Sequence, residues 1–144
     1  RLAKLEDLND LFELDKREFG LDAFPKSLIK KLIMTNDYFR VVSYNGKIVA
    51  YVVYVKPKNS SKARLYSLCV DKDHQRQGIA PRLMRYVEMN YNFSQVRLEV
   101  SVNNEKAIAL YRKLGYKEYG YIERYYADGS DALKMKKVVD FDVI

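Results

Sequence analysis

Residues 75–80, QRQGIA, combine several features that suit the binding of an anion. They lie between an apolar run, which is typical of a strand, and a segment with helical periodicity. Their backbone N–H groups therefore fall at a helix start, where they lack partners and gain about half a unit of positive charge from the helix dipole. Gly78 lets a phosphate approach the backbone, Ala80 is small, and Arg76 adds a full charge. The turn is a candidate phosphate-binding site.

The same residues match neither of two common phosphate-binding motifs. No Gly-Lys-Ser or Gly-Lys-Thr follows, which excludes a P-loop, and the first glycine of the dinucleotide fingerprint is missing. A glycine-containing turn before a helix is also common without any ligand. On its own, the hexapeptide leaves a simple tight turn as the alternative.

The 144-residue chain has one cysteine, Cys69, and one histidine, His74, which limits its chemistry. One cysteine forms no internal disulfide, and this fits a reducing cytoplasm, which is the location we expect. Ligands at zinc spacing are absent, so we expect no metal. The longest apolar run, residues 48–55, is too short to span a bilayer, and we expect no membrane partner.

The formal net charge of +7 is compatible with two kinds of surface. Lysines and arginines are spread along the chain with acids between them, which is typical of a solvated basic surface. The same charge also favours a polyanionic partner, such as a phosphate-bearing cofactor or a nucleic acid. Both interpretations remain open at this point.

Hydrophobic periodicity and turn residues predict the order α-α-β-β-β-α-β-α-β-β in one mixed α+β domain spanning residues 1–144. The third strand, residues 64–70, leads into the turn at 75–80, and the helix after that turn ends near Asn90. Four local signals support this order: Ser27 as an N-cap, Asn45-Gly46 as a hairpin turn, Asn104 as an N-cap and Gly115 at a helix end.

Alternation along VRLEVSV, residues 96–102, separates two faces of a strand. The apolar face holds Val96, Leu98, Val100 and Val102. Arg97, Glu99 and Ser101 fall on the other face, so Glu99 is either an ordinary solvent-facing glutamate or an acid-base group in a cleft. Tyr111 shares a face of the next helix with apolar residues, which by itself indicates core packing.

Two separate stretches resemble one enzyme family. The segment LCVDKDHQRQGIA is similar to the pyrophosphate-binding motif Gln/Arg-x-x-Gly-x-Gly/Ala of the GNAT superfamily of acetyl-CoA-dependent N-acetyltransferases. The segment LEVSVNNEKAIALYRKLGYKEYGYIERYYADGSDALKMK closely resembles ribosomal-protein alanine N-acetyltransferases and the catalytic subunits of N-terminal acetyltransferases. The resemblance covers residues 41–136 and implies the GNAT fold: a mixed, mostly antiparallel sheet with a splayed central strand pair and helices on both faces.

The resemblance implies that acetyl-CoA is the acetyl donor, and it also implies which residues bind it. The turn would hold the pyrophosphate, the end of the third strand would offer backbone groups to the pantetheine arm, and the helix cap would add a contact. The residues implied are Leu68, Cys69, Val70, Gln75, Arg76, Gln77, Gly78, Ile79, Ala80 and Asn104.

The resemblance likewise implies two catalytic residues. Glu99 would accept the proton of the acceptor amine, directly or through a water, and Tyr111 would protonate the departing thiolate. Cys69 lies in no motif typical of a nucleophile, so we expect direct transfer rather than an acetyl-cysteine intermediate.

The sequence constrains the acceptor amine less than the acetyl donor. AFPKS, residues 23–27, resembles the family's substrate loop, with Lys26 where an aromatic or aliphatic residue is usual, and Tyr125-Tyr126 resembles the hairpin that closes over a peptide N-terminus. We therefore expect Phe24, Pro25, Tyr125 and Tyr126 to bind a peptide or protein N-terminus, such as that of a ribosomal protein. The alternatives are a polyamine or aminoglycoside, a lysine side chain, or a non-catalytic CoA- or nucleic-acid-binding module. Glu99 and Tyr111 together weigh against the last.

Overall fold

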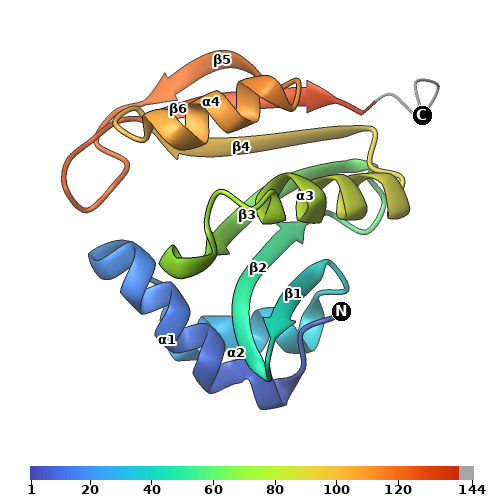
Figure 1. The fold of residues 1–144 in the computed structure, drawn as a ribbon. Helices are drawn as coiled ribbons and strands as arrows, with labels where there is room; N and C mark the ends of the chain where they lie inside the picture. Colours follow the sequence, from blue (N-terminus) through green and yellow to red (C-terminus); the bar gives the residue numbers. More distant parts are fainter. Residues whose placement is uncertain (140–144) are drawn as a thin grey trace. The chain divides into compact units, whose positions relative to one another are not determined.

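The fold is known from a computed structural model, and the residues that it describes are 1–139 (Figure 1). The predicted order of helices and strands is confirmed, with three short 3-10 turns in addition. The elements are η1 Leu5–Asp7, α1 Leu8–Phe19, η2 Gly20–Asp22, α2 Lys26–Thr35, β1 Phe39–Tyr44, β2 Lys47–Val55, β3 Lys62–Val70, η3 Lys72–His74, α3 Ile79–Asn90, β4 Gln95–Ser101, α4 Glu105–Lys113, β5 Lys117–Ile122 and β6 Ala132–Val138. None of the described helices is long and apolar enough to cross a membrane.

The six strands follow the order β1-β2-β3-β4-β6-β5. The pairs β1–β2, β4–β6 and β5–β6 are antiparallel, whereas β3–β4 is parallel. The β3–β4 register covers only residues 62–64 and 95–97, although both strands continue beyond it. The predicted mixed, mostly antiparallel sheet is confirmed, and the short central register agrees with a splayed strand pair.

The chain divides into two compact units. Unit 1 comprises residues 1–55 and 66–84, and unit 2 comprises residues 56–65 and the described chain from residue 85 onward. Strand β3 and helix α3 therefore each contribute to both units. A single domain over residues 1–144 stays a prediction.

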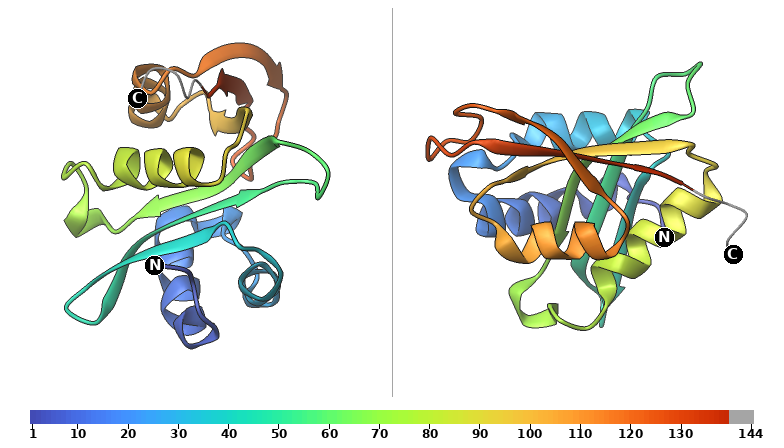
Figure 2. Two further views of the ribbon diagram at one scale, coloured as in Figure 1. Left: turned by 90° about the vertical axis from the view of Figure 1, so that its right-hand side faces the viewer. Right: turned by 90° about the horizontal axis from the view of Figure 1, so that it is seen from above.

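In unit 1, helices α1 and α2 pack on the β1–β2 hairpin (Figure 2). Asn45 and Gly46 join the two strands with φ values of 52° and 78°, which confirms the predicted turn. Alternate residues of the hairpin face the helices. Phe39, Val41, Tyr51 and Val53 of the hairpin form a core with Leu11, Leu14, Ile29 and Leu32 of the helices. The acceptor loop predicted at Phe24-Pro25 connects the two helices and so rests on this core.

The predicted start of α2 is wrong by two residues. The helix begins at Lys26 with Pro25 as its N-cap, so Ser27 lies inside the first turn and caps nothing. The carbonyl oxygen of Pro25 accepts from the N–H groups of Leu28 and Ile29 at 3.0 and 3.2 Å, so the first turn of the helix forms two residues before the predicted cap. Proline fixes φ near the value this position needs, and that outweighs the capping preference of serine.

In unit 2, α4 lies alongside β4, β6 and β5 (Figure 1). The two predicted faces of β4 are confirmed: Val96, Leu98 and Val100 are buried, whereas the residues between them are exposed or half-buried. Asn104 caps α4 as predicted, because its Oδ1 accepts from the N–H of Ala107 at 3.2 Å. The cap fixes where the helix begins, and hence where Tyr111 lies.

A buried polar cluster also holds unit 2 together. Glu88 of α3 is 1% exposed and accepts a hydrogen bond from the Tyr116 hydroxyl at 2.7 Å. Lys137 of β6 places its Nζ 2.6 Å from Glu88 Oε1, and it also donates to the Leu114 carbonyl oxygen at 3.1 Å. The cluster thus joins α3, the α4–β5 junction and β6.

Replacing Lys137 by Met should destabilise the protein by about 3 kcal/mol, because it removes the cation that lies 2.6 Å from the buried Glu88 carboxylate. Urea unfolding followed by circular dichroism measures this loss. The double variant Glu88→Gln with Lys137→Met should recover most of it, since the amide still accepts from Tyr116 and carries no charge. If the double variant is as unstable as the single one, the loss comes from packing rather than from charge.

Candidate active site

The turn at 75–80 in unit 1 contains two residues with a left-handed backbone conformation. Gly78 has φ +77°, and Arg76 adopts φ +64°, which is unusual for a residue with a side chain. The first bond of α3 runs from Arg82 N to Gly78 O at 3.3 Å, so the N–H groups of Gly78, Ile79 and Ala80 precede it. A Cβ added to Gly78 would meet no protein atom within 4 Å, so the space beside this glycine is open.

The strand leading to this turn carries the residues implied for the pantetheine arm. Cys69 is buried, and burial raises the pKa of its thiol well above the usual range. Leu68 and Val70 are half-buried, and the Val70 carbonyl oxygen accepts a bond from Gln75 Nε2 at 3.1 Å. The Gln75 side chain therefore ties the turn to β3 through its Nε2.

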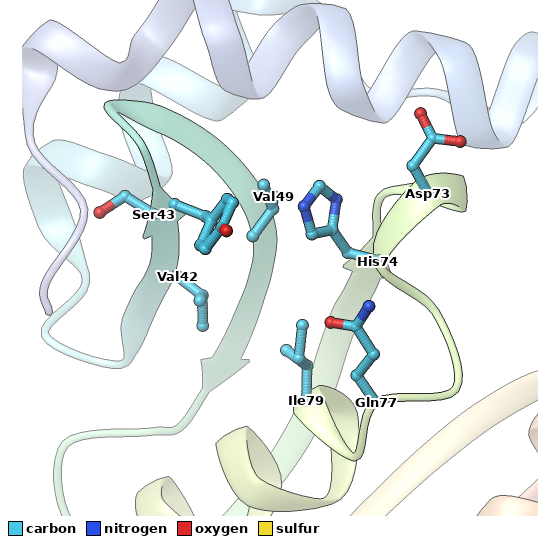
Figure 3. Close-up of a pocket in the computed structure, with 8 residues that line it drawn as sticks. Val42, Ser43, Val49, Asp73, His74, Gln77 and Ile79 are labelled. Carbon is cyan, nitrogen blue, oxygen red and sulfur yellow. The ribbon is translucent and has the colours of Figure 1, made fainter.

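A cavity of about 270 Å³ lies beside the same turn within unit 1 (Figure 3). It is lined by Val42, Ser43, Tyr44, Val49, Asp73, His74, Gln77 and Ile79. The predicted residues Gln77 and Ile79 thus border an open space. No group of three His, Cys, Asp or Glu side chains among the described residues could hold a metal.

A buried carboxylate, that of Asp15, binds the backbone of the predicted acceptor loop at Phe24-Pro25. Asp15 is 1% exposed; its Oδ2 accepts from the Phe24 N–H at 2.7 Å, and its Oδ1 accepts from the Tyr51 hydroxyl. Burial raises the pKa of Asp15, although both hydrogen bonds favour its charged form. The Phe24 ring stacks on Tyr66, with centroids 5.3 Å apart, and Pro25 is exposed. The loop is therefore held at its backbone and at one ring.

In unit 2, Glu99 is held by an arginine. Arg64 of β3 donates from Nε to Glu99 Oε2 at 3.1 Å and from Nη2 to the Tyr125 hydroxyl at 3.1 Å. The Glu99 side chain is 10% exposed, and its Oε1 has no partner within residues 1–139. Burial lowers the pKa of Arg64, but Glu99 and Tyr125 outweigh it and raise that pKa overall. Glu99 is thus fixed through one oxygen and free to accept through the other.

Tyr125 and Tyr126 lie in the loop between β5 and β6, so they are not a cross-strand pair. Their rings meet edge to face, with centroids 5.0 Å apart. Both backbone N–H groups donate to the Ser130 carbonyl oxygen, at 3.1 and 3.2 Å, which closes the loop on itself. The two rings therefore form one aromatic element, which Arg64 joins to Glu99.

Tyr111 of α4 is buried, yet its hydroxyl has no hydrogen-bond partner within the described chain. Buried tyrosines normally have one, and both Tyr51 and Tyr116 do so here. Burial raises the pKa of Tyr111 to about 12, so the group keeps its proton at neutral pH. The hydroxyl is a proton donor with no structural use.

The predicted site residues fall into two sets, each within one unit. Phe24, Pro25, residues 68–70 and residues 75–80 belong to unit 1, and Glu99, Asn104, Tyr111, Tyr125 and Tyr126 belong to unit 2. Within unit 2, the structure brings Glu99 and Tyr125 together through Arg64. The roles of Arg64 and Asp15 have no signal in the sequence, because they depend on strand pairing and on the burial of α1.

These features are those of an enzyme that transfers an acyl group from coenzyme A. The chain belongs to the acetyltransferase (GNAT) family, whose sequence profile matches residues 5–116. The family, the fold class and the enzyme class expected from the sequence, an acetyl-CoA-dependent N-acetyltransferase, are therefore confirmed.

Individual relatives agree over most of the chain. The chain is 30% identical over 94% of its length to an N-alpha-acetyltransferase of Sulfurisphaera tokodaii, 89% of which it covers. It is 32% identical over 90% of its length to the ribosomal protein bS18 alanine N-acetyltransferase of Escherichia coli, 89% of which it covers. The structure of Ard1 from Thermoplasma volcanium superposes with a TM-score of 0.89 at 26% identity, over 97% of this chain and 96% of that one.

The free hydroxyl of Tyr111 leads to a kinetic prediction. Tyr111→Phe should lower kcat by about a hundredfold or more, since positioned acid catalysis contributes that much, with little change in acetyl-CoA affinity by calorimetry. Its thermal stability should match the wild type, because no internal hydrogen bond is lost. With the Tyr111 pKa at about 12, loss of this proton should not lower the wild-type rate between about pH 7 and pH 10.

Tyr121→Phe is the matched control, because it removes a hydroxyl from an exposed tyrosine of β5. Its turnover should equal that of the wild type. Equal turnover in Tyr111→Phe as well would make Tyr111 a packing residue.

Proposed function

We propose that this chain transfers the acetyl group of acetyl-CoA to the α-amine of a peptide or protein N-terminus. One observation carries the proposal: unit 2 holds a proton acceptor and a proton donor that are both fixed and both unused. Within residues 1–139, Glu99 Oε1 and the Tyr111 hydroxyl make no hydrogen bond although both side chains are largely buried. Neither belongs to the fully buried atoms that lack a partner, so both can be reached by a bound substrate.

In the proposed reaction, Glu99 accepts a proton from the acceptor amine, directly or through a water. The neutral nitrogen then attacks the thioester carbonyl carbon, so that a C–N bond forms and the C–S bond breaks. The departing CoA thiolate takes its proton from the Tyr111 hydroxyl. The transfer is direct, because the buried Cys69 thiol with its raised pKa makes a poor nucleophile.

The cofactor contacts are proposed from the turn and strand of unit 1. The N–H groups of Gly78, Ile79 and Ala80, which precede the first helical bond of α3, suit a pyrophosphate, and the exposed Arg76 adds a cation. Backbone groups of residues 68–70 would receive the pantetheine arm. We also propose a contact from Asn104 through groups that its capping bond leaves free.

An α-amine is favoured over other amines for two reasons. Its pKa lies near 8, about two units below that of lysine, so a single carboxylate suffices to remove the proton. The anchored Phe24-Pro25 loop and the Tyr125-Tyr126 pair offer aromatic surface to the backbone that follows an N-terminus. The proposed acceptor is therefore a protein N-terminus, with ribosomal proteins as one class to test.

A single peptide carrying both a free α-amine and an internal lysine tests the proposal. After incubation with acetyl-CoA, tandem mass spectrometry should place the acetyl group mainly on the α-amine. The same peptide with a blocked N-terminus is the control and should react much more slowly. Acetylation mainly at the lysine, or of free polyamines only, would contradict the proposed acceptor and leave acetyl transfer itself standing.

A further inference from the structure

Four basic side chains form a line across four strands of unit 2. Arg64 of β3 lies opposite Arg97 of β4 in the parallel register. Arg97 lies opposite Lys136 of β6, which in turn lies opposite Lys117 of β5. Residues directly opposite each other share a face of the sheet. Arg64, Arg97, Lys136 and Lys117 are called the basic row below.

The basic row opposes stability, so its charges need another explanation. Like charges directly opposite each other on neighbouring strands repel. Arg97, Lys117 and Lys136 form no ion pair within residues 1–139, and Arg97 and Lys117 are exposed. The Lys136 ammonium lies 4.9 Å from the Tyr119 ring centroid, a contact that leaves its charge uncompensated. Three neighbouring cations without an ion pair among residues 1–139, next to the paired Arg64, are suited to an anionic ligand.

The row is continuous with the proposed acceptor site. Its first member, Arg64, contacts both Glu99 and Tyr125. A further cation, Lys134, lies opposite Glu99 in the β4–β6 register. A chain whose N-terminal amine lies at Glu99 would therefore meet positive charge as soon as it leaves the site along this face.

We propose that the basic row binds acidic side chains that closely follow the N-terminal residue of the acceptor, so that the enzyme prefers acidic N-terminal segments. This inference rests on the proposed function and names its substrate class. Strands lie about 4.8 Å apart, so three steps along the row span about 14 Å, which an extended peptide covers in about four residues. The acidic residues that matter are thus about the third to sixth of the acceptor.

A nucleic acid would also be attracted to such a row. The acidic peptide is favoured because the row starts at the proposed base and at the aromatic pair, where an acceptor chain must begin. A nucleic acid has no comparable reason to end there. The overall charge of +7, which catalysis leaves unexplained, is then in part a substrate-binding property.

Two peptides test the inference: they share the first two residues and differ in carrying either Glu or Gln at the third to sixth positions. The measured quantity is the ratio of kcat/KM for the Glu peptide to kcat/KM for the Gln peptide. For the wild type we expect a ratio of about five to ten at low salt, from a few exposed charge pairs. The ratio should fall as salt screens them.

The variant R97Q/K117Q/K136Q should bring the ratio close to one. It should also be at least as stable as the wild type by thermal unfolding, because it removes cross-strand repulsion. The matched control K30Q/K31Q/K47Q neutralises three exposed lysines of unit 1 and should keep the wild-type ratio.

The outcomes separate this inference from the proposed function. Equal kcat/KM for both peptides, with acetylation at the α-amine, overturns the inference and leaves the function standing. Acetylation only at lysine overturns the function. A single-stranded RNA oligonucleotide that binds the wild type but not the row variant, while the peptide ratio stays unchanged, would assign the row to nucleic acid and overturn the inference.

Discussion

The ion pair between Arg64 and Glu99 is the interaction on which the proposed chemistry depends. A carboxylate side chain that is only 10% exposed needs a charged or hydrogen-bonding partner to offset the cost of its burial. Arg64 supplies that partner through one nitrogen and holds Tyr125 through another. The parallel pairing of β3 with β4 places Arg64 on the strand next to that of Glu99. This pairing consists of only three residue pairs. The few residues of this register thus fix the proposed base and the aromatic pair together.

The polar groups of the core divide according to whether they have partners. Asp15 with Tyr51, and Glu88 with Tyr116 and Lys137, form satisfied clusters that join elements within each unit. Each of these groups is buried and used, so it stabilises the fold. Tyr111 is buried less completely, at 8% exposed against 2% for Tyr51 and Tyr116, and within residues 1–139 its hydroxyl makes no hydrogen bond. This contrast is the physical reason for assigning chemistry to Tyr111 and packing to the other two tyrosines.

Local signals explain what could be predicted from the sequence. Asn45-Gly46, the alternation along β4 and the Asn104 cap depend on neighbouring residues, and all three are confirmed. The two motifs identified the family because they carry residue types at fixed spacing, which the profile match over residues 5–116 confirms. The sequence therefore predicted the class of enzyme and the elements that carry Glu99, Asn104 and Tyr111, whereas Tyr125 and Tyr126 lie beyond the end of β5 rather than in the strand.

Features that depend on tertiary contacts could not be predicted. Arg64 was one basic residue among 26, and only the β3–β4 register places it beside Glu99. In the sequence, Asp15 is one residue at helical spacing in α1. Its burial places its carboxylate where it accepts a hydrogen bond from the Phe24 N–H. Ser27 was taken for a cap because the bonds to the Pro25 carbonyl oxygen are invisible in the sequence. In each case a distant partner decided the role.

The pH dependence of kcat/KM for a peptide, in the wild type and in Glu99→Gln, tests the account most directly. A neutral amide cannot accept the proton, so the variant should have a lower rate and an ascending limb shifted to higher pH. Glu123→Gln, at an exposed glutamate of the same unit, should retain the wild-type profile. A Glu99→Gln profile that coincides with that of the wild type in height and position would show that the amine loses its proton in bulk solvent, and would contradict the role of Glu99.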